Sequence, residues 1–93
     1  MNNFDTLLTN INLNNIHPPP EIEEVLNFFN SKRLDRKRCH GYMLLKYAVA
    51  KECKRVEEFN VILIVQVTNH LWKTSTTHEK VEYCDLAQRI KSH

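Results

Sequence analysis

Residues 61–67 read VILIVQV, and the fold class of this 93-residue chain depends on whether they form a strand or a helix. The β-branched composition alone favours a buried strand. A strand needs a partner, however, and no other stretch of the chain shows alternation or a hairpin turn. Read at helical spacing, Leu63-Ile64, Val67-Thr68 and Leu71-Trp72 form one apolar stripe. We therefore predict a helix over residues 59–72, with packing overriding propensity.

The sequence on either side of this segment also predicts helices. Between Gly41 and about Val56, apolar residues recur at steps of three or four, at Tyr42, Leu45, Val49 and Cys53. Near the C-terminus, Thr76 followed three residues later by Glu79 is typical of a capping box that begins a last helix. The chain is therefore expected to be all-α.

The N-terminal third differs in composition from the rest of the chain. Residues 1–20 are rich in asparagine and end in three prolines, which favours extended conformations and predicts a flexible tail. Residues 21–31 follow the prolines with acids in the first turn and apolar residues at helical spacing, which predicts a short amphipathic helix. Residues 32–93 remain as one main domain, since a chain this short holds one domain at most.

Charge is divided unevenly along the chain, although the net charge is only +2. Residues 1–31 carry four acids and no lysine or arginine, whereas residues 32–93 carry 13 basic and seven acidic residues. A basic domain favours polyanionic partners through counterion release. The densest basic stretch consists of Lys32, Arg33, Arg36, Lys37 and Arg38. Charge alone fits a solvated linker equally well.

Several functional classes find little support in the residues. The three cysteines are an odd number without a Cys-x-x-Cys pair, which argues against a disulfide framework and favours a reducing, intracellular compartment. The histidines and cysteines lack the paired spacing of a zinc site, and a single glycine allows no phosphate-cradling loop. The longest apolar run is too short to span a bilayer. We therefore expect no enzymatic activity, no metal or other cofactor, and no membrane partner.

Spaced residues in the C-terminal half, together with a segment upstream of them, resemble a known family. The spaced set is Trp72-Lys73, Thr76, Glu79-Lys80, Tyr83 and Ala87, and the upstream segment, residues 38–45, reads RCHGYMLL. This order resembles the HMG box, and the divergent fungal mating-type and sex-determining boxes look most similar. The resemblance covers residues 36 to about 92. It implies an L-shaped three-helix fold, with the first two helices antiparallel and the third leaving steeply beside an extended N-terminal strand. Tyr42, Trp72 and Tyr83 would meet at the corner of the L.

The function implied by the resemblance is binding and bending of double-stranded DNA through the minor groove, as a transcription regulator in the nucleus. In sequence-specific boxes the residue at the position of Met43 wedges between base pairs, flanked by the aromatic at Tyr42. His40 stands where such boxes usually carry a base-contacting asparagine. The residues that match DNA-contacting positions are Arg36, Lys37, Arg38, His40, Tyr42, Met43, Lys46, Asn60, Val61 and Ile62. Ordinary alternatives are core packing for Met43 and solvation for His40.

Departures from the family pattern leave a second hypothesis open. Val61 and Ile62 replace small polar residues, so they either form a second apolar wedge or dock a protein partner. Glu57 and Glu58 would repel a nearby phosphate surface. The alternative function is a protein-interaction module with an HMG-box fold and weak or no DNA binding. A further hypothesis is that the acids of residues 21–24 lie over the basic strand and inhibit DNA binding.

Overall fold

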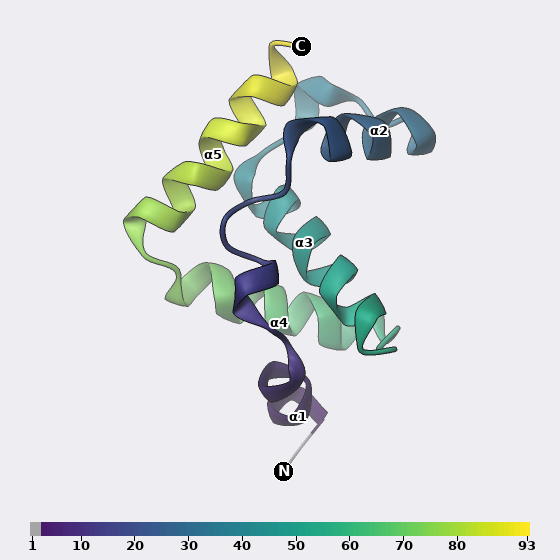
Figure 1. The fold of residues 1–93 in the computed structure, drawn as a ribbon, viewed down its shortest axis with the longest axis vertical. Helices are drawn as coiled ribbons and strands as arrows, with labels where there is room; N and C mark the ends of the chain where they lie inside the picture. The colour runs from purple at the N-terminus through teal and green to yellow at the C-terminus, as the bar shows by residue number, and fades with distance from the viewer. Residues whose placement is uncertain (1–2) are drawn as a thin grey trace.

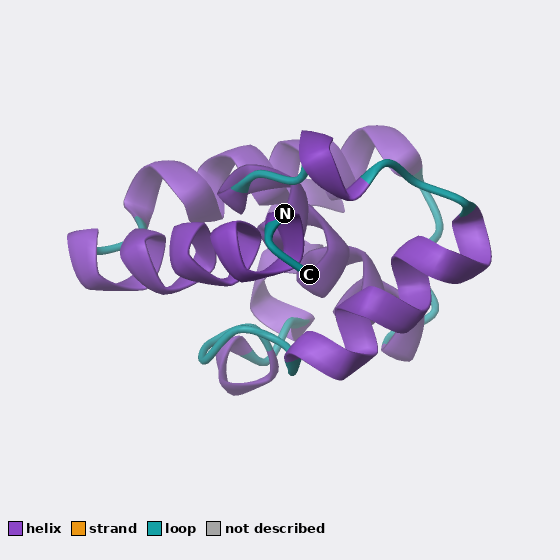
Figure 2. Cartoon of the chain, turned by 90° about the horizontal axis from the view of Figure 1, so that it is seen from above, coloured by secondary structure: helices purple, strands orange, loops and turns teal. Residues whose placement is uncertain are grey.

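The computed structural model describes residues 3–93, which form α-helices and two short 3-10 helices. In chain order these are α1 (Asn3–Asn10), η1 (Leu13–Asn15), α2 (Ile22–Lys32), η2 (Arg36–Arg38), α3 (Gly41–Arg55), α4 (Val61–Thr74) and α5 (Thr77–Lys91). No strand occurs within the described range, as the view from above in Figure 2 also shows. The all-α prediction is therefore confirmed.

Helix α3 is central, because it packs against both α4 and α5. Figure 1 shows α5 leaving the end of α4 at a steep angle, with α3 inside that angle. Helix α1 packs on α4, whereas α2 and η2 pack on α5. The chain between α1 and α2 crosses α3 in this view and connects the lower part of the molecule to the upper part. None of the helices in residues 3–93 combines the length and apolar character needed to cross a bilayer.

The segment with the ambiguous sequence is helical, as predicted. Asn60 caps the start of α4 by accepting hydrogen bonds from the backbone N–H groups of Ile62 and Leu63, at 3.0 and 3.3 Å. The buried residues of α4 are Val67, Thr68 and Leu71, which share one face. Because α1 and α3 both cover α4, burial of this stripe outweighs the β-propensity of its first turns.

The prediction for the last helix is also confirmed in detail. Thr76 Oγ1 accepts a hydrogen bond from Glu79 N at 3.1 Å, and Glu79 Oε1 accepts one from Thr76 N at 2.9 Å. Both halves of the capping box are therefore present. These bonds hold the pKa of the Glu79 carboxyl below its ordinary value, mainly through the Thr76 backbone N–H.

The predicted flexible tail is wrong for the described part of residues 1–20, while residues 1 and 2 lie outside the described range. Residues 3–10 form α1, and Leu7, Ile11 and Ile16 are buried in the core. The physical reason is a helical repeat hidden among the asparagines, with apolar residues at positions 4, 7, 8 and 11. Asn12 contributes to order, because its side chain accepts a hydrogen bond from Asn14 N and caps η1.

Candidate nucleic-acid interface

The basic segment forms one 3-10 turn instead of the expected extended strand. Asp35 caps this turn by accepting a hydrogen bond from Lys37 N at 2.9 Å, which pulls residues 36–38 into η2. The backbone becomes extended only at Cys39 and His40. Cys39 is fully buried and fixes the segment, and its burial raises the pKa of the thiol. Arg38 lies 4.0 Å from Asp35 in an exposed pair, so its charge remains available to a partner.

His40 is positioned by the start of α3. It is the N-cap, and its Nδ1 accepts a hydrogen bond from Met43 N at 3.3 Å. The exposed His40 ring stacks near Tyr42, with ring centroids 6.4 Å apart and planes inclined by 17°. With Nδ1 engaged as an acceptor, Nε2 is left to carry the proton and donate outward. His40 can therefore offer one hydrogen bond to a ligand.

Tyr42 connects α3 to the second half of α4. Its hydroxyl is hydrogen-bonded to the side-chain carbonyl of Asn69, and its ring meets Trp72 edge to face with centroids 6.2 Å apart. Because the start of α3 lies beside the end of α4, these two helices run in opposite directions. Lys80 lies over the Trp72 ring at 5.7 Å and ties α5 to the same cluster.

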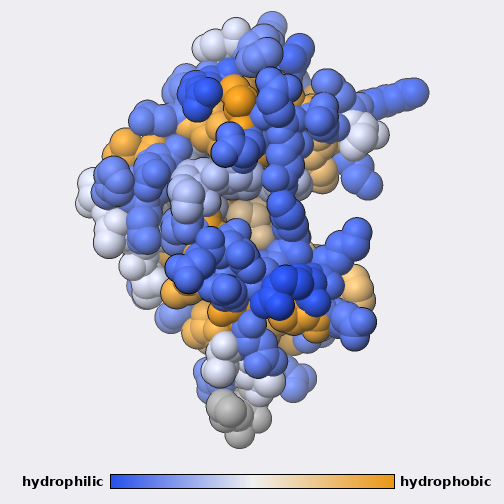
Figure 3. Space-filling view, viewed as in Figure 1, coloured by the Kyte–Doolittle hydropathy of each residue, from blue (hydrophilic) through white to orange (hydrophobic). Residues whose placement is uncertain are grey.

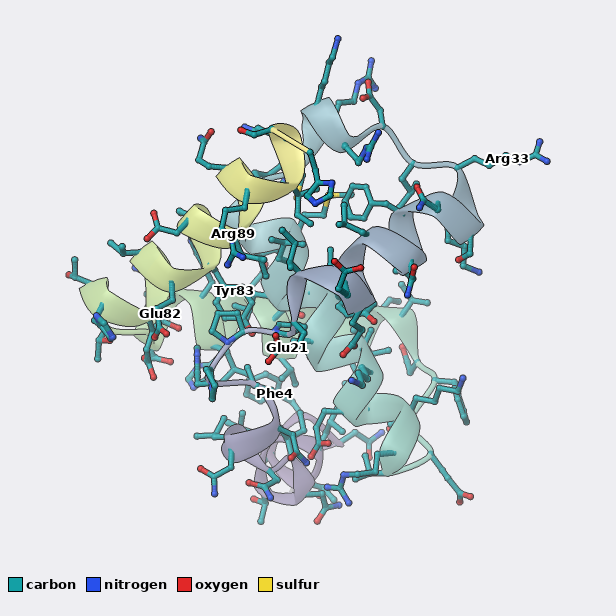
Figure 4. All side chains as sticks on the ribbon, turned by 45° about the horizontal axis from the view of Figure 1, so that its top comes forward. Phe4, Glu21, Arg33, Glu82, Tyr83 and Arg89 are labelled. Carbon is teal, nitrogen blue, oxygen red and sulfur yellow. The ribbon has the colours of Figure 1, made fainter. Side chains whose placement is uncertain are left out.

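Tyr83 takes part in a different contact from the one expected. It is buried, and its hydroxyl donates to the backbone carbonyl of Ile16 while its ring lies edge-on to His17. Figure 4 shows the Tyr83 side chain pointing from α5 toward the segment before α2. The Tyr42 ring therefore packs against Trp72, whereas Tyr83 anchors the N-terminal segment.

Gly41 allows the close approach of α3 to α4 and α5. A Cβ atom added here would lie 3.0 Å from Cys84 Sγ, 3.1 Å from Trp72 Cη2 and 3.3 Å from Cys84 N. Such distances are shorter than ordinary van der Waals contact, so a side chain at this position forces its neighbours to move. Gly41 is needed for the packing around the tryptophan.

We expect Gly41→Ala to lower the free energy of unfolding by about 1 to 2 kcal/mol, because overpacking outweighs the helix propensity gained. Urea denaturation followed by circular dichroism measures the change. Adding Cys84→Ala should recover part of the loss, since it removes the nearest atom, whereas Cys84→Ala alone should be nearly neutral. A Gly41→Ala variant as stable as wild type would contradict this close packing.

Met43 is half-buried in a groove between α2 and α3. The groove has a volume of about 570 Å³, and its lining also includes Phe28, Leu34 and Lys46. The Phe28 ring lies against Tyr47 with centroids 4.6 Å apart, so α2 forms one wall beside Met43. The Met43 side chain is therefore neither fully packed in the core nor fully exposed to solvent.

Two of the three acids in the inhibition hypothesis, Glu21 and Glu24, lie beside helices other than η2. Glu24 accepts a hydrogen bond from Tyr47 and pairs with Lys51 on α3, both at 2.7 Å. The bond from Lys51 lowers the pKa of Glu24, while burial and Glu24 together raise the pKa of Tyr47 to about 12. Glu21 lines a separate groove with Arg89 of α5. These contacts fasten α2 to the other helices.

Asn60, Val61 and Ile62 lie apart from the other candidate residues. Since α3 has 15 residues, it is about 22 Å long and separates them from His40 at its other end. The Asn60 side chain is occupied as the cap of α4. Val61 and Ile62 are 67% and 69% exposed and, with Phe59 at 66%, form an apolar patch. The structure thus gathers the candidates from Arg36 to Lys46 around the start of α3 and leaves a second group at its far end.

Sequence reasoning missed a buried carboxylate, that of Glu52, which is 3% exposed. Glu52 accepts hydrogen bonds from Asn12 N at 2.7 Å and Asn15 Nδ2 at 3.0 Å, and two more from the Arg55 guanidinium at 2.7 Å. The Arg55 bonds, with those from the two asparagines, lower the pKa of Glu52 to about 2. A glutamate on the apolar face of a predicted helix was the available signal.

Comparisons with protein-family models, curated proteins and solved structures found no match to this chain. Within residues 3–93, histidine, cysteine and acidic side chains form no cluster of three or more that could hold a metal ion.

Proposed function

We propose that this chain binds double-stranded DNA in the minor groove and bends it, as an HMG-box-like transcription regulator acting in the nucleus. One observation carries the proposal: the half-buried Met43, with Tyr42 beside it, closely follows the cationic segment Arg36–Arg38 at one end of α3. Cationic side chains can contact phosphates, while an apolar side chain beside them can wedge between base pairs.

The arrangement of the helices supports the proposal. Helices α3 and α4 are antiparallel through the contact of Tyr42 with Asn69, and α5 leaves α4 steeply. Segment η2 lies along α5, in the order that the resemblance implies for the basic N-terminal strand. This geometry leaves the start of α3 accessible next to the basic segment.

The interface is expected to bind weakly. Phosphate contacts give affinity without sequence readout, and His40 offers a single outward donor where specific boxes carry an asparagine. Glu57 and Glu58 precede the second group of candidates and oppose a phosphate surface. We expect dissociation constants of roughly 10⁻⁴ to 10⁻⁶ M at physiological salt, the range of nonspecific binding.

A second candidate function follows from the apolar patch formed by Phe59, Val61 and Ile62. Two-thirds exposure of three neighbouring apolar side chains is unusual for a surface that meets only water. If the patch inserts into DNA as a second wedge, it supports the DNA-bending function proposed first. If it instead docks a protein partner, the chain is a protein-interaction module.

A gel-shift assay at low salt tests both candidates, using short A/T-rich duplexes and four-way junctions with wild type and Ile62→Asp. We expect wild type to shift both probes and Ile62→Asp to bind about tenfold more weakly, a loss of about 1.4 kcal/mol, with unchanged monomer mass. The control Val81→Asp places the same charge on an exposed apolar residue of α5.

One outcome contradicts the first proposal, and another reassigns the apolar patch. A wild-type protein that shifts neither probe at low salt excludes the DNA function. An Ile62→Asp variant that dissociates a wild-type oligomer while DNA affinity stays unchanged assigns the patch to a protein partner. Sedimentation equilibrium over a concentration series supplies the mass in each case.

A further inference from the structure

The groove between α2 and α3 is a built surface that the resemblance does not account for. Its floor is apolar and includes Phe28, Met43 and Tyr47. Figure 3 shows the molecule hollowed at the edge where α2 overhangs the lower half of α3. Val25 and Phe29, also on α2, are fully buried in the core. Helix α2, which forms the overhanging wall of the groove, is therefore firmly held.

Lysines surround this apolar floor. Lys32 comes from the end of α2, and Lys46, Lys51 and Lys54 come from successive turns of α3. Only Lys51 is neutralised, by Glu24 at 2.7 Å. Within residues 3–93 no carboxylate lies within ion-pair distance of the other three, all of which are exposed. The groove therefore holds three uncompensated positive charges.

The spacing of these charges favours an extended polyanion over a single anionic group. Lys46 and Lys54 are eight residues apart on α3, which is about 12 Å along the helix axis, and Lys32 stands on the opposite wall. A DNA strand carries one phosphate per 3.4 Å of helix axis, so lysines about 12 Å apart can contact different phosphates of one strand. Deoxyribose edges are largely apolar and suit the floor.

We propose that the α2–α3 groove carries a stretch of the sugar-phosphate backbone of bound DNA, with Lys32 and Lys54 pairing to phosphates. The inference rests on the proposed DNA function and extends it, because α2 then enlarges the interface beyond the box-like part of the chain. Met43 and Lys46 line the groove and also belong to the candidate interface, so the two surfaces are continuous. Helix α2 thus assists DNA binding and does not inhibit it.

The salt dependence of DNA binding tests this proposal. Each phosphate contact contributes about 0.9 to the slope of log affinity against log salt, so Lys32→Gln/Lys54→Gln should reduce the slope by about 1.8. Its matched control is Lys73→Gln/Arg89→Gln, which removes the same charge from α4 and α5 outside the groove and should leave the slope close to wild type. Because all four side chains are exposed, both variants should fold, and circular dichroism verifies this.

Ethylation interference on the duplex gives a second readout. Ethylation of the phosphates that Lys32 and Lys54 contact should block binding by wild type and by the control variant. It should not affect binding by the Lys32→Gln/Lys54→Gln variant. A groove variant with the wild-type slope and the wild-type interference pattern overturns the groove proposal while the DNA function stands. That result is also what an acidic protein segment as the true occupant would give. If wild type does not bind DNA, both proposals are wrong together.

Discussion

Glu52→Gln is expected to lower the free energy of unfolding by roughly 2 to 3 kcal/mol at neutral pH and to remove the part of the acid sensitivity that comes from this carboxylate. The carboxylate is buried and accepts hydrogen bonds from Asn12, Asn15 and Arg55. A glutamine turns one acceptor oxygen into a donating NH₂ group, which faces other donors and leaves them unsatisfied. Urea denaturation at pH 7 measures the loss.

The pH dependence of stability has a defined sign. The pKa of Glu52 is about 2 in the folded chain and about 4.5 when it is unperturbed. Its stabilising contribution is therefore fully present above pH 4.5 and is lost as the pH falls toward 2. In Glu52→Gln this part of the acid transition should disappear. Denaturation series at several pH values between neutrality and 2 reveal the difference.

The matched control is Glu57→Gln, which removes a carboxylate from an exposed residue just beyond the end of α3. This variant should retain nearly the full stability at pH 7 and the acid transition of wild type. Hydrogen exchange at the Asn12 amide gives a local readout, because this N–H donates to Glu52. Equal acid sensitivity in Glu52→Gln and wild type would show that the carboxylate does not hold the N-terminal segment.

Sequence rules predicted helices correctly where a clear capping pattern, or the lack of a partner strand, decided the structure. The capping box of Thr76 and Glu79 predicted the start of α5, and the missing partner strand excluded a sheet for residues 61–67. The rules failed for residues 3–17, where asparagines obscured the spacing of Leu7 and Ile11. Contacts with residues distant in sequence order that segment, such as the hydrogen bond from Tyr83 to Ile16. A local sequence pattern cannot reveal such contacts.

The candidate site was predictable in part for a similar reason. Residues from Arg36 to Lys46 lie close together because they are contiguous along η2 and the start of α3. The groove beside them was not predictable, since it needs Lys32 of α2 and Lys54 of α3, which are far apart in sequence, to line the same groove. The turn at η2 was missed because the short-range cap by Asp35 overrides the extended conformation that the resemblance implies.

Met43→Ala is expected to remove most of the DNA bending while leaving affinity within about tenfold of wild type. An apolar side chain that wedges between base pairs kinks DNA by about 20 to 90°, so we expect the variant to bend DNA by less than about 20°. Affinity should survive because, on the proposed DNA function, it would come mainly from phosphate contacts by residues such as Arg38 and Lys46. Energy transfer between dyes at the two ends of a short duplex measures the bend at saturating protein.

Two further variants separate the wedge from general weakening. Met43→Leu keeps a large apolar side chain and should preserve most of the bend, whereas Lys46→Gln should weaken binding and leave the bend angle unchanged once the DNA is saturated. Because Met43 also packs against the core, each variant needs a thermal unfolding curve before its bend is interpreted. An unchanged bend in folded Met43→Ala assigns this side chain to packing within the α2–α3 groove. DNA distortion would then have to come from the apolar patch of Phe59, Val61 and Ile62, which the Ile62→Asp variant tests.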